Sequence, residues 1–366
     1  MVDGYYIGQM SGTSLDSIDT AIIEIQNGEC SLIENHSLKW PQEIEQRLRQ
    51  LIEQGDSLDE MLQLDQVCAQ FFSQAARECL EKTHLQPDSI KAIGCHGQTV
   101  RHSPNSDPAY SLQIGNPNTI AEITGITTVS DFRNRDIAAG GQGAPLAPAF
   151  HEALFRHSQK KRVVLNIGGI ANITILTDEA LKGYDTGPGN RLLDDWIRYS
   201  KNLPYDNNGE YAASGKTHRI LLSNLLDDPY FKLAAPKSTG SDYFNLSWLN
   251  YHLLDFSDLP AEDIQATLAS LTAISIADQI KLATMKCDEV LVCGGGVHNA
   301  FLMKLIEQQL PKSIVSSTEI HDIDPDWLEA MAFAWLAHQT LSGLPGNATN
   351  VTGAKGPRIC GNICQA

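Results

Sequence analysis

The sequence predicts an α/β protein built from two lobes, and three observations support this fold class. Apolar strand patterns alternate with helical patterns over the first 137 residues, which is typical of an α/β lobe. Residues 5–25 and 163–176 share one plan, in which a glycine-rich turn joins two apolar strands. The chain has 366 residues, enough for two lobes with separate cores. The repeated hairpin predicts two related halves that face one anionic ligand.

The composition is that of a globular protein with an acidic surface. Hydrophobic residues make up 42% and charged residues 19%, which excludes a disordered or fibrous chain. The net charge of −17 argues against nucleic acid or an anionic membrane as a main partner. No apolar run approaches the roughly 18 residues of a membrane span. The eight cysteines form no C-x-x-C pair, and the chain starts without a secretory signal, so we expect a cytoplasmic protein with reduced thiols.

The first lobe is predicted to span residues 1–137 together with the tail, residues 345–366. Residues 5–8 and 20–25 are strand-like, and the turn between them is rich in Gly, Ser, Thr and Asp. Such a turn can be an ordinary hairpin turn, or it can direct backbone N–H groups into an anion cradle.

The rest of the first lobe alternates helices and strands. Residues 41–54 and 59–82 carry apolar side chains at helical spacing. Residues 90–95 and 126–131 read as strands on either side of a short helix. Small residues at 138–145 then mark the predicted boundary between the lobes.

The second lobe is predicted to span residues 138–344. After the hairpin at 163–176 comes a Gly/Pro loop at 183–190, a helix at 191–199 and a polar insertion near 204–247. Further on, we expect a strand at 290–293 and helices at 262–286, 300–309 and 327–341.

Three glycine-rich turns follow strands, at residues 12–16, 168–172 and 294–299. None belongs to a P-loop, because the chain contains no G-x-x-x-x-G-K-[ST]. Together they predict a nucleotide held in a cleft between two lobes, with the two hairpin turns on either side of its phosphates. The third turn, which opens a helix, would lie against adenosine or offer helix N–H groups.

Asp185 is the candidate catalytic residue. It lies among Gly, Thr and Pro residues in the predicted loop, where an Asp can also serve as a helix cap or an Asx-turn. Phosphoryl transfer needs positioning, charge neutralisation and one base that orients or deprotonates the nucleophile. Asp185 is placed to be that base.

Distinctive motifs occur along the whole chain: MSGTSLD at 10–16, GCHGQTV at 94–100, DFR at 131–133, GGQGAPL at 140–146, NIGGIAN at 166–172, YDTGPGN at 184–190, APKSTG at 235–240, CGGG at 293–296, EAMAFAWLA at 329–337 and GLPGN at 343–347. In these motifs the chain resembles the anhydro-N-acetylmuramic acid kinase family over essentially its whole length. It implies a two-lobed actin-like fold with RNase H-like cores around a central nucleotide cleft.

The resemblance also implies the reaction. The family's substrate is a 1,6-anhydro amino sugar, which is phosphorylated by ATP with Mg²⁺ while water opens the anhydro ring, in peptidoglycan recycling. Asp185 then activates the water, Arg133 and Glu329 contact the sugar, and the protein is a homodimer. His96 is expected to stabilise the loop wall, and Asp16 to help position the magnesium ion through water. The implied ATP contacts are Gly12, Thr13, Ser14, Leu15, Asp16, Ser17, Ile18, Asp19, Gly168, Gly169, Asn172, Gly294, Gly295, Gly296 and Asn299.

The chain departs from the family pattern at Gln9, Ser17, Asn134 and residues 360–365. These departures bear on local sugar contacts and on how the tail packs. Three alternatives stay open: a kinase for another amino sugar, an actin- or chaperone-like ATPase, and a non-catalytic sugar sensor. The fold alone does not distinguish them.

Overall fold

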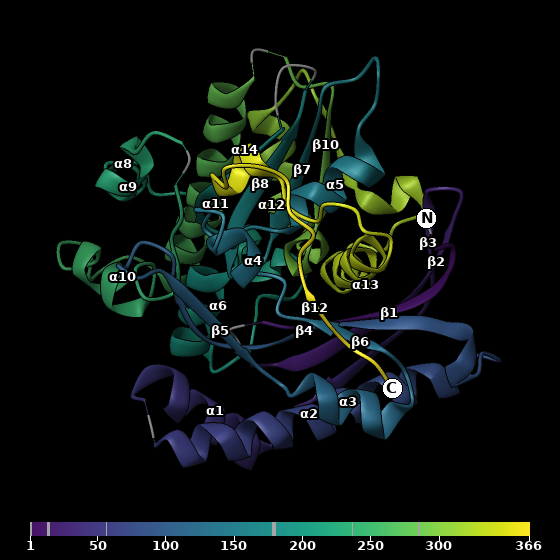
Figure 1. Ribbon diagram of the computed structural model, residues 1–366. Helices are drawn as coiled ribbons and strands as arrows, with labels where there is room; N and C mark the ends of the chain where they lie inside the picture. Colours follow the sequence, from purple (N-terminus) through teal and green to yellow (C-terminus); the bar gives the residue numbers. More distant parts are fainter. Residues whose placement is uncertain (1, 13–14, 56, 178–180, 236, 285) are drawn as a thin grey trace. The chain divides into compact units, whose positions relative to one another are not determined.

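The computed structural model describes residues 2–12, 15–55, 57–177, 181–235, 237–284 and 286–366, and these form two compact units (Figure 1). Unit 1 comprises Met1–Leu154 and Trp327–Ala366, and unit 2 comprises Phe155–Asp326. The chain therefore passes between the units at 154/155 and 326/327, whereas the predicted lobe boundaries were 137/138 and 344/345. The small residues at 138–145 belong to unit 1, because backbone N–H groups of Gln142 and Lys355 donate to Thr352 and Ala139 across that segment.

Unit 1 contains a seven-stranded sheet of order β12-β6-β4-β1-β2-β3, with β5 paired to β4. Strands β1 to β3 form an antiparallel meander, and β4 and β6 add in parallel beside β1. The C-terminal tail returns to this sheet, where β12 pairs antiparallel with β6. The strands are β1 (Gly4–Ser11), β2 (Ser17–Gln26), β3 (Glu29–Lys39), β4 (Ile90–Ser103), β5 (Tyr110–Ile114), β6 (Thr128–Ser130) and β12 (Asn362–Cys364).

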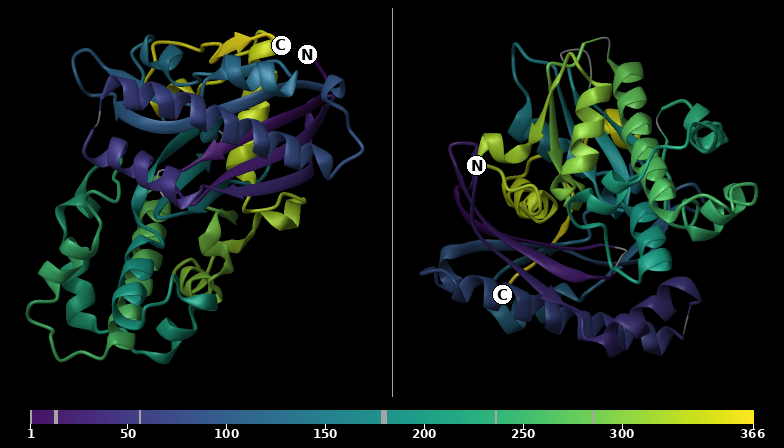
Figure 2. Two further views of the ribbon diagram at one scale, coloured as in Figure 1. Left: turned by 90° about the horizontal axis from the view of Figure 1, so that it is seen from below. Right: turned by 180° about the vertical axis from the view of Figure 1, so that it is seen from behind.

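Helices cover both faces of the unit 1 sheet (Figures 1 and 2). On one face, Leu64 and Phe72 of α2 share a buried cluster with Ile7 and Ile22 of the sheet. Helix α13 packs on the other face against β1, β2 and β4. The elements of unit 1 outside the sheet are α1 (Gln42–Glu53), α2 (Leu58–Glu81), η1 (Pro87–Ser89), α3 (Pro117–Thr124), α4 (Asn134–Ile137), α5 (Ala147–Phe155), α13 (Leu328–Leu341) and α14 (Thr349–Thr352).

Two glycines allow α13 to lie directly on the sheet. A Cβ on Gly8 would lie 1.9 Å from the carbonyl oxygen of Ala330, and one on Gly94 would lie 2.0 Å from that of Phe333. Any larger residue at either strand position would push the helix away. This packing fixes the start of α13, where Glu329 lies.

Unit 2 repeats the topology of unit 1. Its sheet has the order β11-β10-β7-β8-β9, again an antiparallel meander of three strands followed by two parallel strands. The strands are β7 (Arg162–Ile167), β8 (Ile170–Leu176), β9 (Leu181–Pro188), β10 (Glu289–Cys293) and β11 (Ile314–Ser317). This shared order is RNase H-like and confirms the predicted actin-like α/β fold.

Two apolar clusters organise the helices of unit 2. One places α11 and α12 against β7, β8 and β10, and the other joins helices of the predicted insertion to the first half of α11. Among the described residues, no helix has both the length and the apolarity needed to cross a membrane. The helices are α6 (Arg191–Lys201), η2 (Asn207–Gly209), α7 (Glu210–Ser214), α8 (Arg219–Leu226), α9 (Pro229–Lys232), α10 (Leu246–His252), α11 (Ala261–Ala283), η3 (Gly295–His298), α12 (Ala300–Gln309) and η4 (Thr318–His321).

Two strands differ from the sequence-based expectation. The Gly/Pro segment predicted as a loop at 183–190 is mostly strand β9, which pairs with β8 and lies at the edge of its sheet. An edge strand tolerates Gly and Pro because only one side of its backbone must pair within the sheet. Strand β3 was not predicted, and its alternately exposed residues explain the weak apolar signal.

Asp136 holds the C-terminal segment to the segment that follows α4. Its fully buried carboxylate accepts hydrogen bonds from the Asn347 amide at 2.6 Å, the Thr352 hydroxyl at 2.8 Å and the Gly143 N–H at 2.8 Å. All three donors would lose their partner if the carboxylate were removed.

We therefore expect Asp136→Ala to lower the free energy of unfolding of unit 1 by about 3 kcal/mol, the range for breaking a buried charged network. Urea unfolding of the full chain measures this loss. Asp88→Ala, at an exposed site in unit 1, serves as the control and should change stability by less than about 0.5 kcal/mol. Equal losses of stability in the two variants would contradict the role of Asp136 in holding the C-terminal segment.

Candidate functional site

Asp185 lies at one end of a polar row on the unit 2 sheet, on the edge strand β9. It is paired in register with Asn172 of β8, which is paired in turn with Asn166 of β7. Residues opposite one another on neighbouring strands share a face, so these three side chains emerge on one side of the sheet. Tyr184 points to the opposite face, into the apolar cluster beneath α11. The predicted catalytic residue and the predicted ligand residue Asn172 are thus neighbours.

Every polar group of Asp185 except one oxygen has a partner in the segment around α9. Its N–H donates to the carbonyl of Lys237 at 3.1 Å, and its carbonyl accepts from the Tyr230 hydroxyl at 2.9 Å. Its carboxylate Oδ2 accepts from the N–H of Thr239 at 3.0 Å. Among described residues, Oδ1 receives no hydrogen bond and is free to act on a ligand. Residues 235–240 form one of the motifs that resemble the family, and the sequence indicates no role for them.

The surroundings of Asp185 make it a stronger base than an ordinary carboxylate. Burial raises its pKa from 3.8 to about 6, and the hydrogen bond from Thr239 opposes the rise. A base is most effective when its pKa lies near the working pH. Asp185 therefore remains ionised at neutral pH and can still accept a proton.

The glycine-rich turns of unit 2 lie beside one another. The carbonyl of Gly168 accepts from the N–H of Asn190 at 2.8 Å, and that of Gly169 accepts from the N–H of Gly189 at 2.9 Å. Close packing joins the third turn to them, because a Cβ on Gly294 would lie 2.3 Å from Oδ1 of Asn166. Three segments that are far apart in sequence thus meet at one end of the sheet.

The remaining predicted residues of the third turn have structural partners. Gly295 and Gly296 lie in η3. The side chain of Asn299 caps α12, where its Oδ1 accepts from the N–H of Leu302 at 2.9 Å. Asn299 is buried, so this capping bond gives its side chain a structural role at the start of α12.

In unit 1, the predicted nucleotide turn joins β1 to β2. The carbonyl of Gly12 accepts from the N–H of Leu15 and from the Gln98 side chain, each at 3.3 Å. The side chains of Leu15 and Ile18 are buried in the core of the unit, so only their backbone groups can contact a ligand. The predictions for Thr13 and Ser14 fall outside the described residues.

Two acidic residues near this turn differ in their surroundings. Asp16 is exposed, whereas Oδ1 of Asp19 accepts from the hydroxyls of Ser17 at 2.9 Å and Ser37 at 2.8 Å. No group of three or more His, Cys, Asp or Glu residues able to hold a metal ion occurs within the described ranges.

Arg133 is held by His96. Its Nε and Nη2 donate to Nε2 of His96 at 3.0 and 2.8 Å, and its Nη1 donates to the carbonyl of Gly143 at 2.8 Å. Because Nε2 accepts these bonds, the imidazole is neutral, and burial keeps the pKa of His96 well below its ordinary value. Burial also lowers the pKa of Arg133 to about 10. The predicted wall residue His96 therefore orients the predicted sugar contact.

Glu329 and Arg133 influence each other electrostatically within unit 1. Burial and the charge of Asp19 raise the pKa of Glu329, whereas Arg133 opposes the rise. The two predicted sugar-binding residues and Asp19 are thus brought together. This group offers both a cation and carboxylates to a polar ligand.

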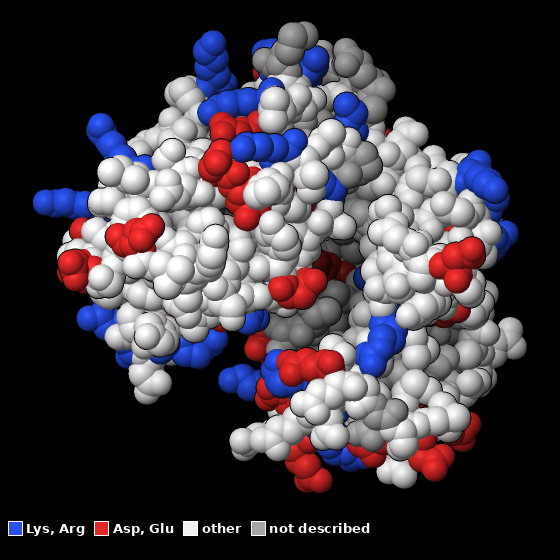
Figure 3. All heavy atoms as spheres, turned by 90° about the vertical axis from the view of Figure 1, so that its left-hand side faces the viewer, with Lys and Arg blue, Asp and Glu red and all other residues white. Residues whose placement is uncertain are grey.

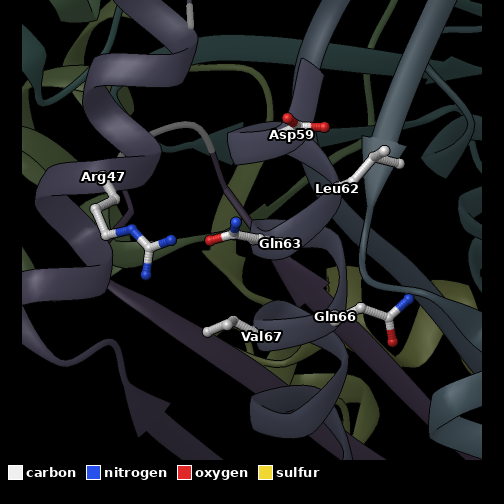
Figure 4. Close-up of a pocket in the computed structure, with 6 residues that line it drawn as sticks. All are labelled: Arg47, Asp59, Leu62, Gln63, Gln66 and Val67. Carbon is white, nitrogen blue, oxygen red and sulfur yellow. The ribbon is translucent and has the colours of Figure 1, made fainter. Parts of the chain in front are cut away.

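A hollow on unit 1 is separate from these residues. It lies between α1 and α2 and is lined by Arg47, Asp59, Leu62, Gln63, Gln66 and Val67 (Figure 4). None of the predicted site residues lines it. Arg47 is engaged there by Glu60, with Nε 2.7 Å from Oε1.

The surface charge is mixed on the face shown in Figure 3. Lys and Arg side chains on that face are dispersed and interleaved with Asp and Glu side chains. Positive and negative side chains therefore lie close to one another on this face of a chain whose net charge is −17.

Comparison with known proteins identifies relatives along the whole chain. A model of the family described as anhydro-N-acetylmuramic acid kinase matches residues 4–366. A protein of that name from Pseudomonas savastanoi pv. phaseolicola is 49% identical over 367 residues, covering 100% of both chains. Another from Pasteurella multocida is 49% identical over 362 residues, covering 98% of this chain and 96% of its own.

A solved structure supports the fold. Component A of (R)-2-hydroxyglutaryl-CoA dehydratase from Acidaminococcus fermentans superposes with a TM-score of 0.50, covering 92% of this chain and 99% of its own. Its sequence is 11% identical, so the likeness concerns the fold.

The raised pKa of Asp185 predicts a pH-dependent gain of stability in Asp185→Asn. The folded state holds the proton more tightly than the unfolded state, so the ionised carboxylate destabilises the fold above pH 6 and ceases to do so as the pH falls toward 4. The variant should be more stable than the parent by about 2 kcal/mol at pH 8. Chemical unfolding at pH 8 and pH 4 measures this difference, and an equal difference at both pH values would contradict the raised pKa.

Proposed function

Because the chain belongs to the anhydro-N-acetylmuramic acid kinase family and is a kinase of cell-wall recycling, we propose how its residues perform the reaction. ATP phosphorylates 1,6-anhydro-N-acetylmuramic acid while water opens the anhydro ring, with Asp185 as the base. The observation that supports this role is the Asp185 carboxylate, which has a pKa of about 6 and one oxygen without a hydrogen bond from the described residues.

The bond changes explain why a base is needed away from the phosphorylated oxygen. In the anhydro sugar, O6 is part of an ether and carries no proton. Water therefore attacks C1 and gives a proton to Asp185. The C1–O6 bond breaks, its electron pair stays on O6, and O6 accepts the γ-phosphoryl group as ADP leaves. The product is N-acetylmuramic acid 6-phosphate.

We assign the nucleotide phosphates to the glycine-rich turns. Backbone N–H groups at Gly12 in unit 1 and at Gly168, Gly169, Gly295 and Gly296 in unit 2 suit phosphate oxygens in a chain with so acidic a charge. Mg²⁺ commonly binds through phosphates, waters and one or two carboxylates. Asp16 and Asp19 are the nearby carboxylates, and the bound ion would neutralise phosphate charge.

Arg133 and Glu329 are the proposed sugar contacts. The guanidinium keeps one N–H on each of Nη1 and Nη2 beyond those given to Gly143 and His96, and these can reach acceptors on the sugar. The Glu329 carboxylate can accept from hydroxyl or amide donors. The attraction between them favours the charged form of each group and opposes the effect of burial.

We also propose a cytoplasmic homodimer. All eight cysteines are free, which suits a reducing compartment where ATP is present. The dimer rests on the family resemblance, and sedimentation of the purified protein tests it.

Asp185→Asn should bind ATP but lose at least about 1,000-fold in kcat, because the amide cannot accept the proton from water. Release of ADP in the presence of the anhydro sugar measures this loss. The exposed control Asp258→Asn should keep normal turnover. In the parent enzyme, kcat/KM should fall about tenfold per pH unit below about 6, as Asp185 becomes protonated.

Isotopic labelling locates the attacked atom. Product made in heavy-oxygen water and quenched early should carry solvent oxygen at C1 and none in the phosphate. Label in the phosphate, or normal activity in Asp185→Asn, would exclude this mechanism.

Arg133→Met should raise KM for the sugar about tenfold or more and leave KM for ATP within about twofold, because the guanidinium is proposed to donate charge-assisted hydrogen bonds to the sugar and none to ATP. Steady-state kinetics with each substrate varied in turn separate the two constants. Arg135→Met, two residues away and exposed, is the matched control. An equal rise of both KM values in Arg133→Met would contradict a sugar-specific contact.

A further inference from the structure

Strand β9 carries Asp185 at the unprotected edge of the unit 2 sheet. An edge strand leaves backbone N–H and C=O groups on its outer side without sheet partners. At Asp185 both groups are instead satisfied by residues that follow or belong to α9, namely the carbonyl of Lys237 and the hydroxyl of Tyr230. The backbone on either side of the carboxylate is therefore fixed from outside the sheet.

The same segment also orients the side chain. The N–H of Thr239 donates to Oδ2 of Asp185, which leaves Oδ1 directed to accept the proton. We name Tyr230, Lys237 and Thr239 the Asp185 clamp. Its three hydrogen bonds engage the N–H, the carbonyl and the carboxylate of Asp185. A loop that only needed to pack against the sheet would not require all three.

The side chain of Lys237 links two parts of the clamp, because it bonds to the backbone of α9, which carries Tyr230. Lys237 is 8% exposed, and its Nζ donates to the carbonyls of Tyr230 at 3.2 Å and Phe231 at 3.5 Å. The same ammonium lies 4.6 Å from the centre of the Tyr230 ring. No Asp or Glu in the described part of the chain forms an ion pair with it. A buried charge held only by carbonyls and a ring is costly, so a hydrophobic residue would serve stability equally well.

Tyr230 is itself held in place. Asp228 caps α9 by accepting from the N–H of Tyr230 at 2.8 Å, and it also accepts from the Tyr243 hydroxyl and the Trp248 indole, each at 2.9 Å. The Tyr230 ring stacks edge-on against buried Phe244, with ring centres 5.3 Å apart. The hydroxyl that reaches Asp185 is thus carried by a rigid support.

We propose that Tyr230 and Lys237 are positioning residues for the catalytic base: they hold Asp185 so that Oδ1 meets the attacking water. This inference rests on the proposed role of Asp185. Among the described residues, neither side chain donates a hydrogen bond to the carboxylate, so both act through the backbone of β9 and through the segment that carries the N–H of Thr239.

Lys237→Met and Tyr230→Phe test the proposal in the full-length enzyme. Lys237→Met removes the charge and keeps the apolar stem, whereas Tyr230→Phe removes one hydroxyl and is the milder change. Each should lower kcat about tenfold, the scale of a misplaced catalytic group, with both KM values within about twofold. Lys232→Met in α9 and Tyr251→Phe in α10 are exposed controls and should keep the parent kcat.

Double variants separate positioning from general stability. Added to Asp185→Asn, Lys237→Met should lower the residual turnover no further, because the clamp has no base left to orient. An equal tenfold loss in both backgrounds, or a parent-like kcat in both single variants, would overturn the proposal. A fully active Asp185→Asn would instead refute the proposed function itself.

Discussion

Burying an ionised carboxylate costs free energy, and unit 2 must meet this cost at Asp185. Burial raises its pKa to about 6, and the single N–H of Thr239 offsets only part of the cost. More donors would stabilise the anion and weaken it as a base, whereas full solvation would return it to an ordinary acid. The rigid sheet and the segment around α9 hold the side chain between these limits.

In unit 1, burial likewise shifts the pKa of a charged side chain, here the cation Arg133. Burial lowers the pKa of Arg133 and raises that of Glu329, and the attraction between them opposes both shifts. His96 satisfies two guanidinium N–H groups without adding a charge, because its own burial keeps it neutral. The guanidinium is thus fixed without being neutralised by its support, which suits a residue that must still attract a polar ligand.

The sequence predicted the elements whose signal is local, and the structure explains the others. Both hairpins and the long helices carry clear periodicity, so their positions were close to those observed. Strand β9 was expected to be a loop because its Gly and Pro residues are rare in strands, and only pairing with β8 at a sheet edge makes them acceptable. The support of Asp185 by Tyr230 and Thr239 spans 45 and 54 residues, and no local pattern encodes such contacts. Asp185 was proposed from the Gly and Pro residues around it, whereas Arg133 and Glu329 were proposed only through the resemblance to the family motifs.

The two units have one topology but differ at the third strand of the meander, and this difference fits the proposed position of the base in unit 2. In unit 1 that strand is β3, whose side chains alternate between exposed and half-buried positions. A carboxylate there would remain solvated and would keep an ordinary pKa. In unit 2 the corresponding strand is β9, whose residues are mostly buried and whose outer edge meets the segment around α9. The insertion between α6 and α11 therefore changes a repeated structural strand into one that can hold a tuned base.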